Sequence, residues 1–291
     1  MKTLFLIISI SFSFLGYTQV PSYVPTDNLL GWWGFNGNAN DETSFSNNGS
    51  VYGAILTQDR FGNTDEAYSF DGANDYIEIS ANNTLIGPTT ELSLSAWINL
   101  ASVNSDKRAV FSQRDTMEFN CDYVYGLWVV ENNYLYTEVN GENTISPVQV
   151  VDSASLNIDT WYFLTLVVDS SQIQLYIDGA LVKSEEVSLG TIDIRNKLAR
   201  IGRHRDLAVN SQFFEGKIDD VGVWSRALTQ CEITALYTTQ DCNVGLLENI
   251  NQPKKLVKQI NLLGQDVDNE SNSILINIYS DGSTKKVVRL E

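Results

Sequence analysis

Basic residues are scarce in this chain of 291 residues. It has 19 lysine and arginine residues against 36 aspartate and glutamate residues, which gives a formal net charge of −17. Nucleic-acid binding needs a basic footprint that is missing here, so nucleic acid is excluded as a partner. Two interpretations of the acidity stay open: a solubilising surface, or cation binding combined with rejection of polyanions.

Cysteine and histidine are also too few for a zinc site. The chain has three cysteines and one histidine, His204, without metal-site spacing. A lone histidine without a serine or cysteine nucleophile gives no sign of catalysis. Cys231 and Cys242 are close enough in sequence to close a short loop, and we expect a disulfide between them in an exported protein. Cys121 is then left over.

Long apolar runs are missing after the first residues, so no transmembrane segment is expected. Residues 1–18 read MKTLFLIISISFSFLGYT, with one lysine and an apolar run from Leu4 to Leu15 that is too short to span a bilayer. This pattern predicts a secretory signal peptide that is cleaved after Thr18. The chain is therefore expected to be exported.

The sequence does have a repeated strand pattern. Residues Leu92–Leu100 alternate apolar and polar side chains, which predicts a strand with one core face. Trp161–Val168 is apolar on both faces and is expected inside a sheet. Asp178-Gly179 separates two alternating segments and predicts a type I′ hairpin turn, because both central residues of that turn need positive φ. The pattern predicts an all-β fold, a two-sheet antiparallel jelly-roll sandwich.

One helix is expected after the last strand of the sandwich. Thr229 and Glu232 form a capping box, and apolar residues such as Ile233 and Leu236 follow at helical spacing. Cys231 lies on this helix, so the expected disulfide would fasten the helix to the chain that leaves the sandwich.

The last predicted strand carries two adjacent acids. Residues 213–228 read FFEGKIDDVGVWSRAL. Strict alternation would put Asp219 on one face with Val221, and Asp220 on the other face with Ile218. A buried carboxylate is costly unless it is paired, hydrogen-bonded or bound to a cation. Something specific must therefore satisfy this pair.

Several motifs together resemble one family. Segment 213–228, WGFNGNAND at 33–41, DRFG at 59–62 and AYSFDGANDYIEI at 67–79 are similar to laminin G-like, concanavalin A-like β-sandwich domains of secreted bacterial proteins. The resemblance covers most of the chain, and the sandwich is expected at residues 27–240. This fold carries lectins, adhesion modules, carbohydrate-binding domains and glycosidases, so the resemblance identifies the architecture more narrowly than the function.

The composition changes after Cys242. Residues 244–291 are richer in lysine and read as a small separate β-domain. This segment resembles the C-terminal sorting domain that is recognised by the type IX secretion machinery; an ordinary small β-domain is the alternative. The resemblance implies a protein that is secreted or held at the outer surface of a Gram-negative bacterium.

The resemblance also implies a structural calcium ion. Related domains bring the first and last strands side by side, which would place residues 36–41 next to the acidic pair, and Ca²⁺ takes six to eight oxygen ligands. In the alternative, the acids accept backbone N–H bonds or pair with an arginine such as Arg226. The expected metal ligands are Asn36, Asp41, Asp219 and Asp220, with Asp41 and Asp219 preferred.

Two loops are expected to hold a ligand. The resemblance implies that loops over one face of the sandwich bind it, and planar polar groups and aromatic rings are what sugars require. As alternatives, the loop residues form a solvated surface, Trp128 lies in the core, and the cluster 203–206 pairs with surface acids. The expected ligand-binding residues are Gln113, Arg114, Asp115, Asn120, Asp122, Tyr125, Arg203, His204 and Arg205.

No catalytic residue is expected. The glucanases of this fold place three acids on one strand as Glu-x-Asp-x-x-Glu, and neither 75–78 nor 115–118, the nearest acidic pairs, reproduces that pattern. The expected function is a non-catalytic carbohydrate-binding module, whose partner is a glycan or another cell-surface ligand. The alternatives are a protein-binding surface adhesion module, and a glycosidase or polysaccharide lyase with a divergent active site.

Overall fold

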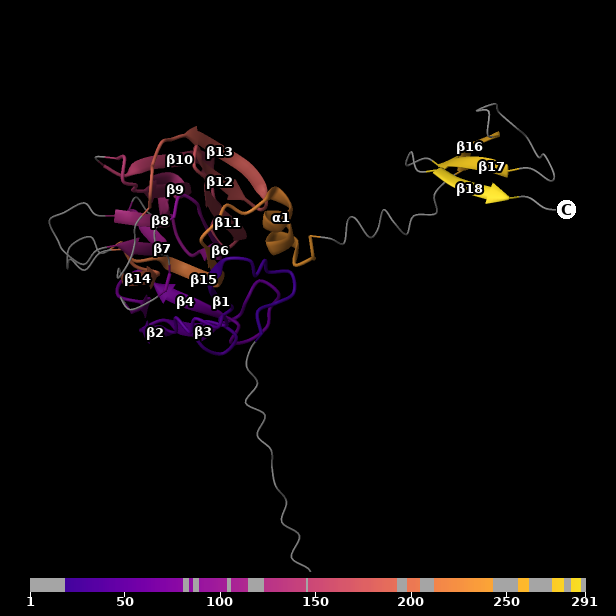
Figure 1. Cartoon of the computed structure of the whole chain (residues 1–291). Coiled ribbons are helices and arrows are strands. Elements are labelled where there is room, and N and C mark those ends of the chain that lie inside the picture. Colours follow the sequence, from indigo (N-terminus) through magenta and orange to yellow (C-terminus); the bar gives the residue numbers. More distant parts are fainter. Residues whose placement is uncertain are drawn as a thin grey trace, which may run out of the picture. The chain divides into compact units, whose positions relative to one another are not determined.

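The chain divides into two compact units, Met1–Asp241 and Cys242–Glu291. A computed structural model describes residues 19–80, 84–85, 89–103, 106–114, 123–144, 146–192, 198–204, 212–242, 256–261, 274–279 and 284–288. Within these residues, the first unit holds two antiparallel sheets and one α-helix (Figure 1). The predicted two-sheet antiparallel sandwich is therefore confirmed.

The first sheet has eight strands within the described residues. They follow the order β13-β12-β11-β6-β15-β4-β3, and β1 also pairs with β15. The strands β4 and β1 lie along successive halves of the same edge of β15. The bounds are β1 (Leu29–Trp33), β3 (Ile55–Thr57), β4 (Ala67–Asp71), β6 (Leu92–Leu100), β11 (Trp161–Val168), β12 (Gln172–Ile177), β13 (Ala180–Glu186) and β15 (Glu215–Trp224).

The second sheet has seven strands in the described part of the chain, in the order β10-β9-β8-β7-β14-β5-β2. A short 3₁₀ turn at Glu131–Asn133 connects two of them. The bounds are β2 (Gly49–Tyr52), β5 (Tyr76–Ile79), β7 (Arg108–Arg114), β8 (Tyr123–Val130), β9 (Tyr134–Val139), β10 (Val148–Ser155) and β14 (Leu198–Ile201).

Both faces of β6 are buried, although its alternation predicts only one core face. The five apolar residues that alternate along β6 are fully buried between the sheets, as predicted. Ser93, Ser95 and Trp97 point to the other face and are buried as well. A second apolar cluster covers that face, because the helix and the N-terminal segment pack on it; the cluster includes Trp32, Trp97, Phe163, Trp224, Ile233 and Leu236.

The strand β15 contains a β-bulge that the alternation did not predict. Its pairing with β6 shifts register between Asp219 and Gly222, and Asp220 has a positive φ of 46°. The extra residue keeps Ile218 and Val221 together in the core between the sheets. Both acids are therefore directed to one side, and the prediction that they lie on opposite faces is wrong.

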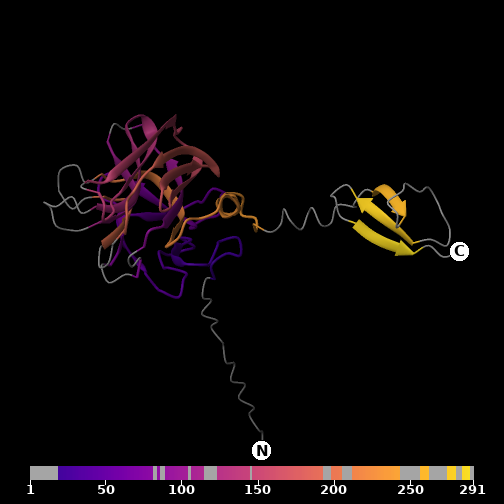
Figure 2. The same cartoon turned by 45° about the horizontal axis from the view of Figure 1, so that its top comes forward.

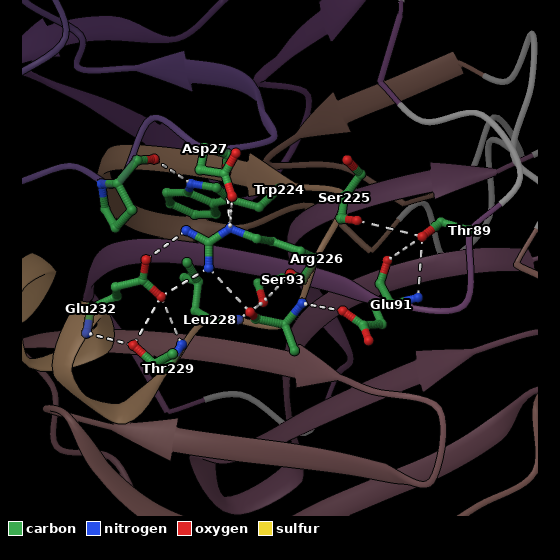
Figure 3. Close-up of polar contacts among 12 residues, drawn as sticks. Asp27, Thr89, Glu91, Ser93, Trp224, Ser225, Arg226, Leu228, Thr229 and Glu232 are labelled. Carbon is green, nitrogen blue, oxygen red and sulfur yellow. Dashed lines mark hydrogen bonds and ion pairs between the residues drawn. The ribbon is translucent and has the colours of Figure 1, made fainter.

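The predicted helix is α1 (Gln230–Thr238), and the predicted capping box begins it. Arg226 binds the N-terminal end of α1 through hydrogen bonds (Figure 3). Its Nη1 and Nη2 donate to the carboxylate of Glu232 at 2.8 and 2.6 Å, and its Nε donates to the carbonyl of Asp27 at 2.9 Å. The hydroxyl of Ser93 on β6 donates to the Arg226 carbonyl at 2.8 Å. These bonds fix α1 on the outer face of the first sheet.

Cys231 and Cys242 form the predicted disulfide. Cys231 lies in the first turn of α1, so the bond ties the helix to residues that follow it. A cross-link that closes a loop of this length is worth about 2–3 kcal/mol, chiefly because it restricts the unfolded chain.

The second unit contains a three-stranded antiparallel sheet in the order β16-β17-β18, drawn in orange and yellow in Figure 2. Its strands are β16 (Leu256–Asn261), β17 (Ile274–Tyr279) and β18 (Thr284–Val288). Among the described residues of the whole chain, the structure contains no helix with the length and hydropathy of a membrane span.

Candidate functional site

The two predicted ligand loops lie at opposite ends of the paired strands β7 and β14. The strand β7 ends at Arg114, which pairs with Leu198 at the start of β14, whereas Arg203 follows the end of β14. The structure describes Arg114 only as a member of β7, without its side chain. The predicted ligand residues Asp115, Asn120, Asp122 and Arg205 lie outside the described residues, so their role stays a prediction.

Three of the predicted ligand residues are buried, and two of them, Tyr125 and Gln113, lie opposite each other on paired strands of the second sheet. The ring of Tyr125 is 1% exposed, lies in the core between the sheets and stacks on Phe111 with ring centroids 5.8 Å apart. Burial also raises the pKa of the Tyr125 hydroxyl. Gln113 is equally buried. The fold encloses these two side chains, which leaves them almost no exposed surface for the ligand contact that the sequence predicts.

The remaining predicted residues lie on the outer face of the second sheet. The guanidinium of Arg203 stacks over the rings of Tyr76 and Phe213, at 4.7 and 5.2 Å. His204 is buried with its ring edge-on to Trp128, 5.1 Å between centroids. Trp128 is buried, as the sequence favours. It lies beneath the side chains of this outer face, however, and not in the core between the sheets.

The expected calcium ligands are not brought together. The first and last strands are adjacent as predicted, with Trp33 opposite Val221. Asp41, however, accepts the backbone N–H of Trp32 at 3.1 Å, and the carbonyl of Trp32 accepts a bond from the same loop. Backbone groups of one strand residue point to one edge of the strand. Asp41 therefore lies on the edge of β1 that faces away from β15 and its acidic pair.

Both oxygens of the Asp41 carboxylate already accept two hydrogen bonds each. Besides Trp32 it accepts bonds from the N–H and hydroxyl of Thr43, at 2.9 and 2.8 Å, and from the N–H of Asn47 at 2.8 Å. Asn36 donates to Glu42 at 3.3 Å. Among the described residues there is no group of three or more histidine, cysteine or acidic side chains suited to a metal ion. These side chains do not fit a shared Ca²⁺ site, and calcium stays a prediction.

An arginine satisfies the acidic pair, as the alternative to calcium proposed, but it is Arg60 and not Arg226. Its Nη1 lies 3.0 Å from Oδ2 of Asp219 and its Nη2 lies 2.8 Å from Oδ2 of Asp220. All three side chains are largely buried. Burial and the neighbouring carboxylate raise the pKa of Asp219, and burial raises the pKa of Asp220, although the arginine counteracts both shifts. The bulge in β15 makes this double ion pair possible.

Arg60 also belongs to an aromatic groove on the outer face of the first sheet. The groove has a volume of about 510 Å³, within the size range of small-molecule sites. Its residues come from the loop before β4, from β6 and β11, from the β12–β13 turn and from the end of α1. They are Arg60, Phe61, Trp97, Trp161, Asp178, Tyr237, Thr238 and Thr239.

The rings of this aromatic groove are held in a stack. The guanidinium of Arg60 lies 4.5 Å from the ring centroids of both Phe61 and Trp97. Trp97 stacks in turn on Tyr237, with centroids 5.7 Å apart. The ring of Phe61 is 66% exposed and Tyr237 is 36% exposed, so part of this aromatic surface is open to solvent. Trp161, partly buried, adds a fourth ring.

Asp178 gives the aromatic groove a carboxylate. It is the first residue of the predicted Asp-Gly turn, and both turn residues have positive φ, 51° and 77°, as a type I′ turn requires. Its Oδ1 accepts the N–H of Phe163 at 2.8 Å. Burial raises the pKa of the Asp178 carboxyl, so partial removal from water weakens its ionisation.

Sequence reasoning did not identify this groove. Phe61 and Arg60 belong to the DRFG motif, Trp161 begins the buried strand, and Asp178 marks the hairpin turn, so in the sequence each indicates structure and not ligand binding. No spacing in the sequence connects these segments. The pairing of the strands connects them, because Trp97 on β6 lies opposite Phe163 on β11 and opposite Asp219 on β15.

Comparison with solved structures identifies similar folds. Domain 4 of AbnA, a GH43 extracellular arabinanase from Geobacillus stearothermophilus, was solved in complex with arabinotriose. It has 17% sequence identity and a TM-score of 0.54, and the match covers 72% of this chain and 98% of that domain. The binding domain of Paraclostridial Mosquitocidal Protein 1 has 14% identity and a TM-score of 0.59, over 90% of this chain and 73% of that chain.

A third similar structure is the botulinum neurotoxin serotype D ligand-binding domain in complex with N-acetylneuraminic acid. It has 17% identity and a TM-score of 0.56, and the match covers 87% of this chain. The chain spans 62% of the length of that domain. No curated protein matches the chain.

A family model covers the sandwich. The laminin G-like model described as the concanavalin A-like lectin/glucanases superfamily matches residues 71–234, which is more than half of the 291 residues. This match agrees with the two antiparallel sheets and with the resemblance of the sequence motifs. The chain belongs to the concanavalin A-like lectin/glucanases superfamily.

Proposed function

We propose that this protein is an exported, non-catalytic module that binds carbohydrate through the aromatic groove. The observation that carries the proposal is the convergence of four rings, a carboxylate and two threonines from separate segments in one groove. Ligand sites are concave, mostly apolar surfaces with a few fixed polar groups. Sugars suit this arrangement, since their C–H faces stack on rings and their hydroxyls bond to carboxylates.

The similar structures support a binding role. The arabinanase domain is described with an oligosaccharide, and the neurotoxin domain with a sugar acid. At this identity they establish the fold alone, so the ligand of this chain is argued from its own residues.

The aromatic groove favours binding over hydrolysis. Glycosidases generally use two carboxyl groups that flank the scissile bond. Among the described residues that line the groove, Asp178 is the single carboxylate. Asp219 and Asp220 are bound to Arg60 beside it. Reducing-sugar release from polysaccharides tests for the enzyme alternative directly.

Removing an exposed ring from the groove is expected to weaken glycan binding without unfolding the protein. Phe61→Ala should lower the affinity for a bound glycan about tenfold or more, as truncation of an aromatic contact at a binding site does. Its melting temperature should change little, because exposed side chains contribute about 0.5 kcal/mol or less. Glycan arrays followed by calorimetric titration of the best-bound oligosaccharide measure the effect.

Phe45→Ala is the matched control, since Phe45 is also an exposed phenylalanine, 46% exposed, and does not line the groove. Equal losses in the two variants would contradict a site at the groove. If no glycan binds the intact chain, and a pull-down with cell-surface proteins succeeds instead, the protein-binding adhesion module replaces the carbohydrate-binding one.

The export part of the proposal rests on the two ends of the sequence. Residues 1–18 have the pattern of a signal peptide and residues 244–291 resemble a type IX sorting domain. In a bacterium with that secretion machinery, the full chain should reach the medium or the outer surface with Gln19 as its first residue. A chain without residues 244–291 should stay in the periplasm, as cell fractionation and N-terminal sequencing would reveal. Equal export of both chains would contradict the sorting role.

A further inference from the structure

The positive charge in the aromatic groove is already paired with two carboxylates. Arg60 is the one cation among the described lining residues, and both of its terminal nitrogens are ion-paired with buried carboxylates. With both acids ionised, Arg60, Asp219 and Asp220 carry a net charge of −1, and with one acid protonated they are neutral. A second cation, Lys217, pairs with Asn99 on the neighbouring strand, but it is not among the residues that line the groove.

The opposite side of the aromatic groove is negative. Asp178 accepts one bond, from the N–H of Phe163, and no cation among the described residues pairs with it. The last turn of α1 ends beside it at Thr238 and Thr239, and the C-terminal end of a helix carries partial negative charge.

The hydroxyl protons of Thr238 and Thr239 are already donated to backbone carbonyls. The hydroxyl of Thr238 donates to the carbonyl of Thr234 at 2.8 Å, and that of Thr239 donates to the carbonyl of Thr238 at 2.7 Å. Each hydroxyl oxygen still has acceptor capacity. The helix end and the carboxylate therefore present acceptors, which suit the hydroxyl donors of a neutral sugar.

We infer that the groove takes a glycan whose sugars carry no negative charge, and that Asp178 is the residue that excludes uronic acids and sulfated sugars. The inference rests on the proposed function. A carboxylate or sulfate that entered the groove would meet Asp178 and the end of α1 at short range, in a partly dehydrated space where like charges repel strongly. Among the described lining residues the one charged donor is Arg60, whose terminal nitrogens are already ion-paired. A neutral sugar meets no such repulsion, because its hydroxyls can donate hydrogen bonds to the oxygens of Asp178 and of the helix end.

Asp178→Asn tests the role of the charge. Asparagine tolerates positive φ and keeps an oxygen that can accept the N–H of Phe163, so the turn is preserved. The probes are a panel of neutral polysaccharides, the acidic galacturonan, alginate and carrageenan, and the best-bound neutral polysaccharide after oxidation of primary hydroxyls to carboxylates. Affinity electrophoresis of the full chain measures all of them, with Phe61→Ala identifying the binding that uses the groove.

We expect the intact chain to bind neutral polysaccharide through Phe61 and to bind the oxidised form at least tenfold more weakly. In Asp178→Asn this preference should shrink by about tenfold. An acidic polysaccharide that binds through Phe61 as tightly as a neutral one, or an unchanged preference in Asp178→Asn, would overturn the inference and leave glycan binding intact. Absence of any binding that depends on Phe61 would overturn the proposed function itself.

Discussion

Replacing Arg60 with alanine should destabilise the folded sandwich by about 3–5 kcal/mol at neutral pH, as removal of one partner from a buried ion pair does. The substitution leaves the side chains of Asp219 and Asp220 largely buried without a cation. It also removes the guanidinium from between the rings of Phe61 and Trp97. Chemical denaturation monitored by tryptophan fluorescence measures the free energy of unfolding.

The loss in the Arg60 variant should depend on pH in a defined direction. The folded-state pKa values of both acids are raised above the unfolded value of about 4 even with Arg60 present. Without the arginine they rise further. Between the unfolded and folded pKa values the folded chain binds more protons, so stability falls as pH increases through that range. The variant should therefore recover part of its stability relative to the natural chain as the pH is lowered toward 4.

Two further variants control this result. Lys183→Ala removes an exposed ion pair with Glu185, and its cost should be about 1 kcal/mol or less at any of these pH values. Arg60→Lys keeps one positive charge but lacks the planar fork that reaches two carboxylates, so its loss should be intermediate. A loss in Arg60→Ala that is as small as that in Lys183→Ala, or that grows on acidification, would contradict the buried double ion pair.

Replacing Asp41 with alanine should cost about 3 kcal/mol or more. Its carboxylate accepts four hydrogen bonds, two of them from the N–H groups of Trp32 and Asn47 in buried positions. Each buried N–H that loses its acceptor costs about 1–3 kcal/mol. The loop 41–47 should open from the edge of β1, and hydrogen exchange at Trp32 and Asn47 should accelerate. Thermal and chemical denaturation measure the overall loss.

The Asp41 experiment also tests calcium. Because the four donors already satisfy this carboxylate, we expect chelation of calcium to leave the melting temperature of the natural chain unchanged. Asp27→Ala is the control for removal of an acid, since Asp27 has an exposed carboxylate near the start of the same strand. A melting temperature that falls on addition of EDTA in the natural chain but not in Asp41→Ala would support the predicted calcium site.

Local patterns predicted the elements of this fold. The alternation along Leu92–Leu100, the positive-φ turn at Asp178 and the capping box of Thr229 and Glu232 each describe an interaction within a few residues. The disulfide was predictable for the same reason, since Cys231 and Cys242 are close in sequence. Such features are encoded by neighbouring residues and need no knowledge of the rest of the chain.

The site depends on contacts that no local pattern contains. The bulge at Asp219 and Asp220 breaks the alternation, and only the pairing of β15 with β4, β6 and β1 reveals it. Arg60 is about 160 residues from the acids it neutralises. Tyr125 was expected to contact a ligand because it is an aromatic residue directly after the acid-rich loop 113–122, yet its ring fills the space between the sheets.

By itself the sequence determined the all-β class, the helix that follows the last strand, the disulfide, and the requirement that something satisfy the pair Asp219 and Asp220. Only the tertiary structure decided that this partner is Arg60 and that the same guanidinium supports an aromatic groove. The physical reason is that a strand specifies its own two faces, whereas the strands, loops and helix that meet over one face are chosen by the packing of the whole sandwich.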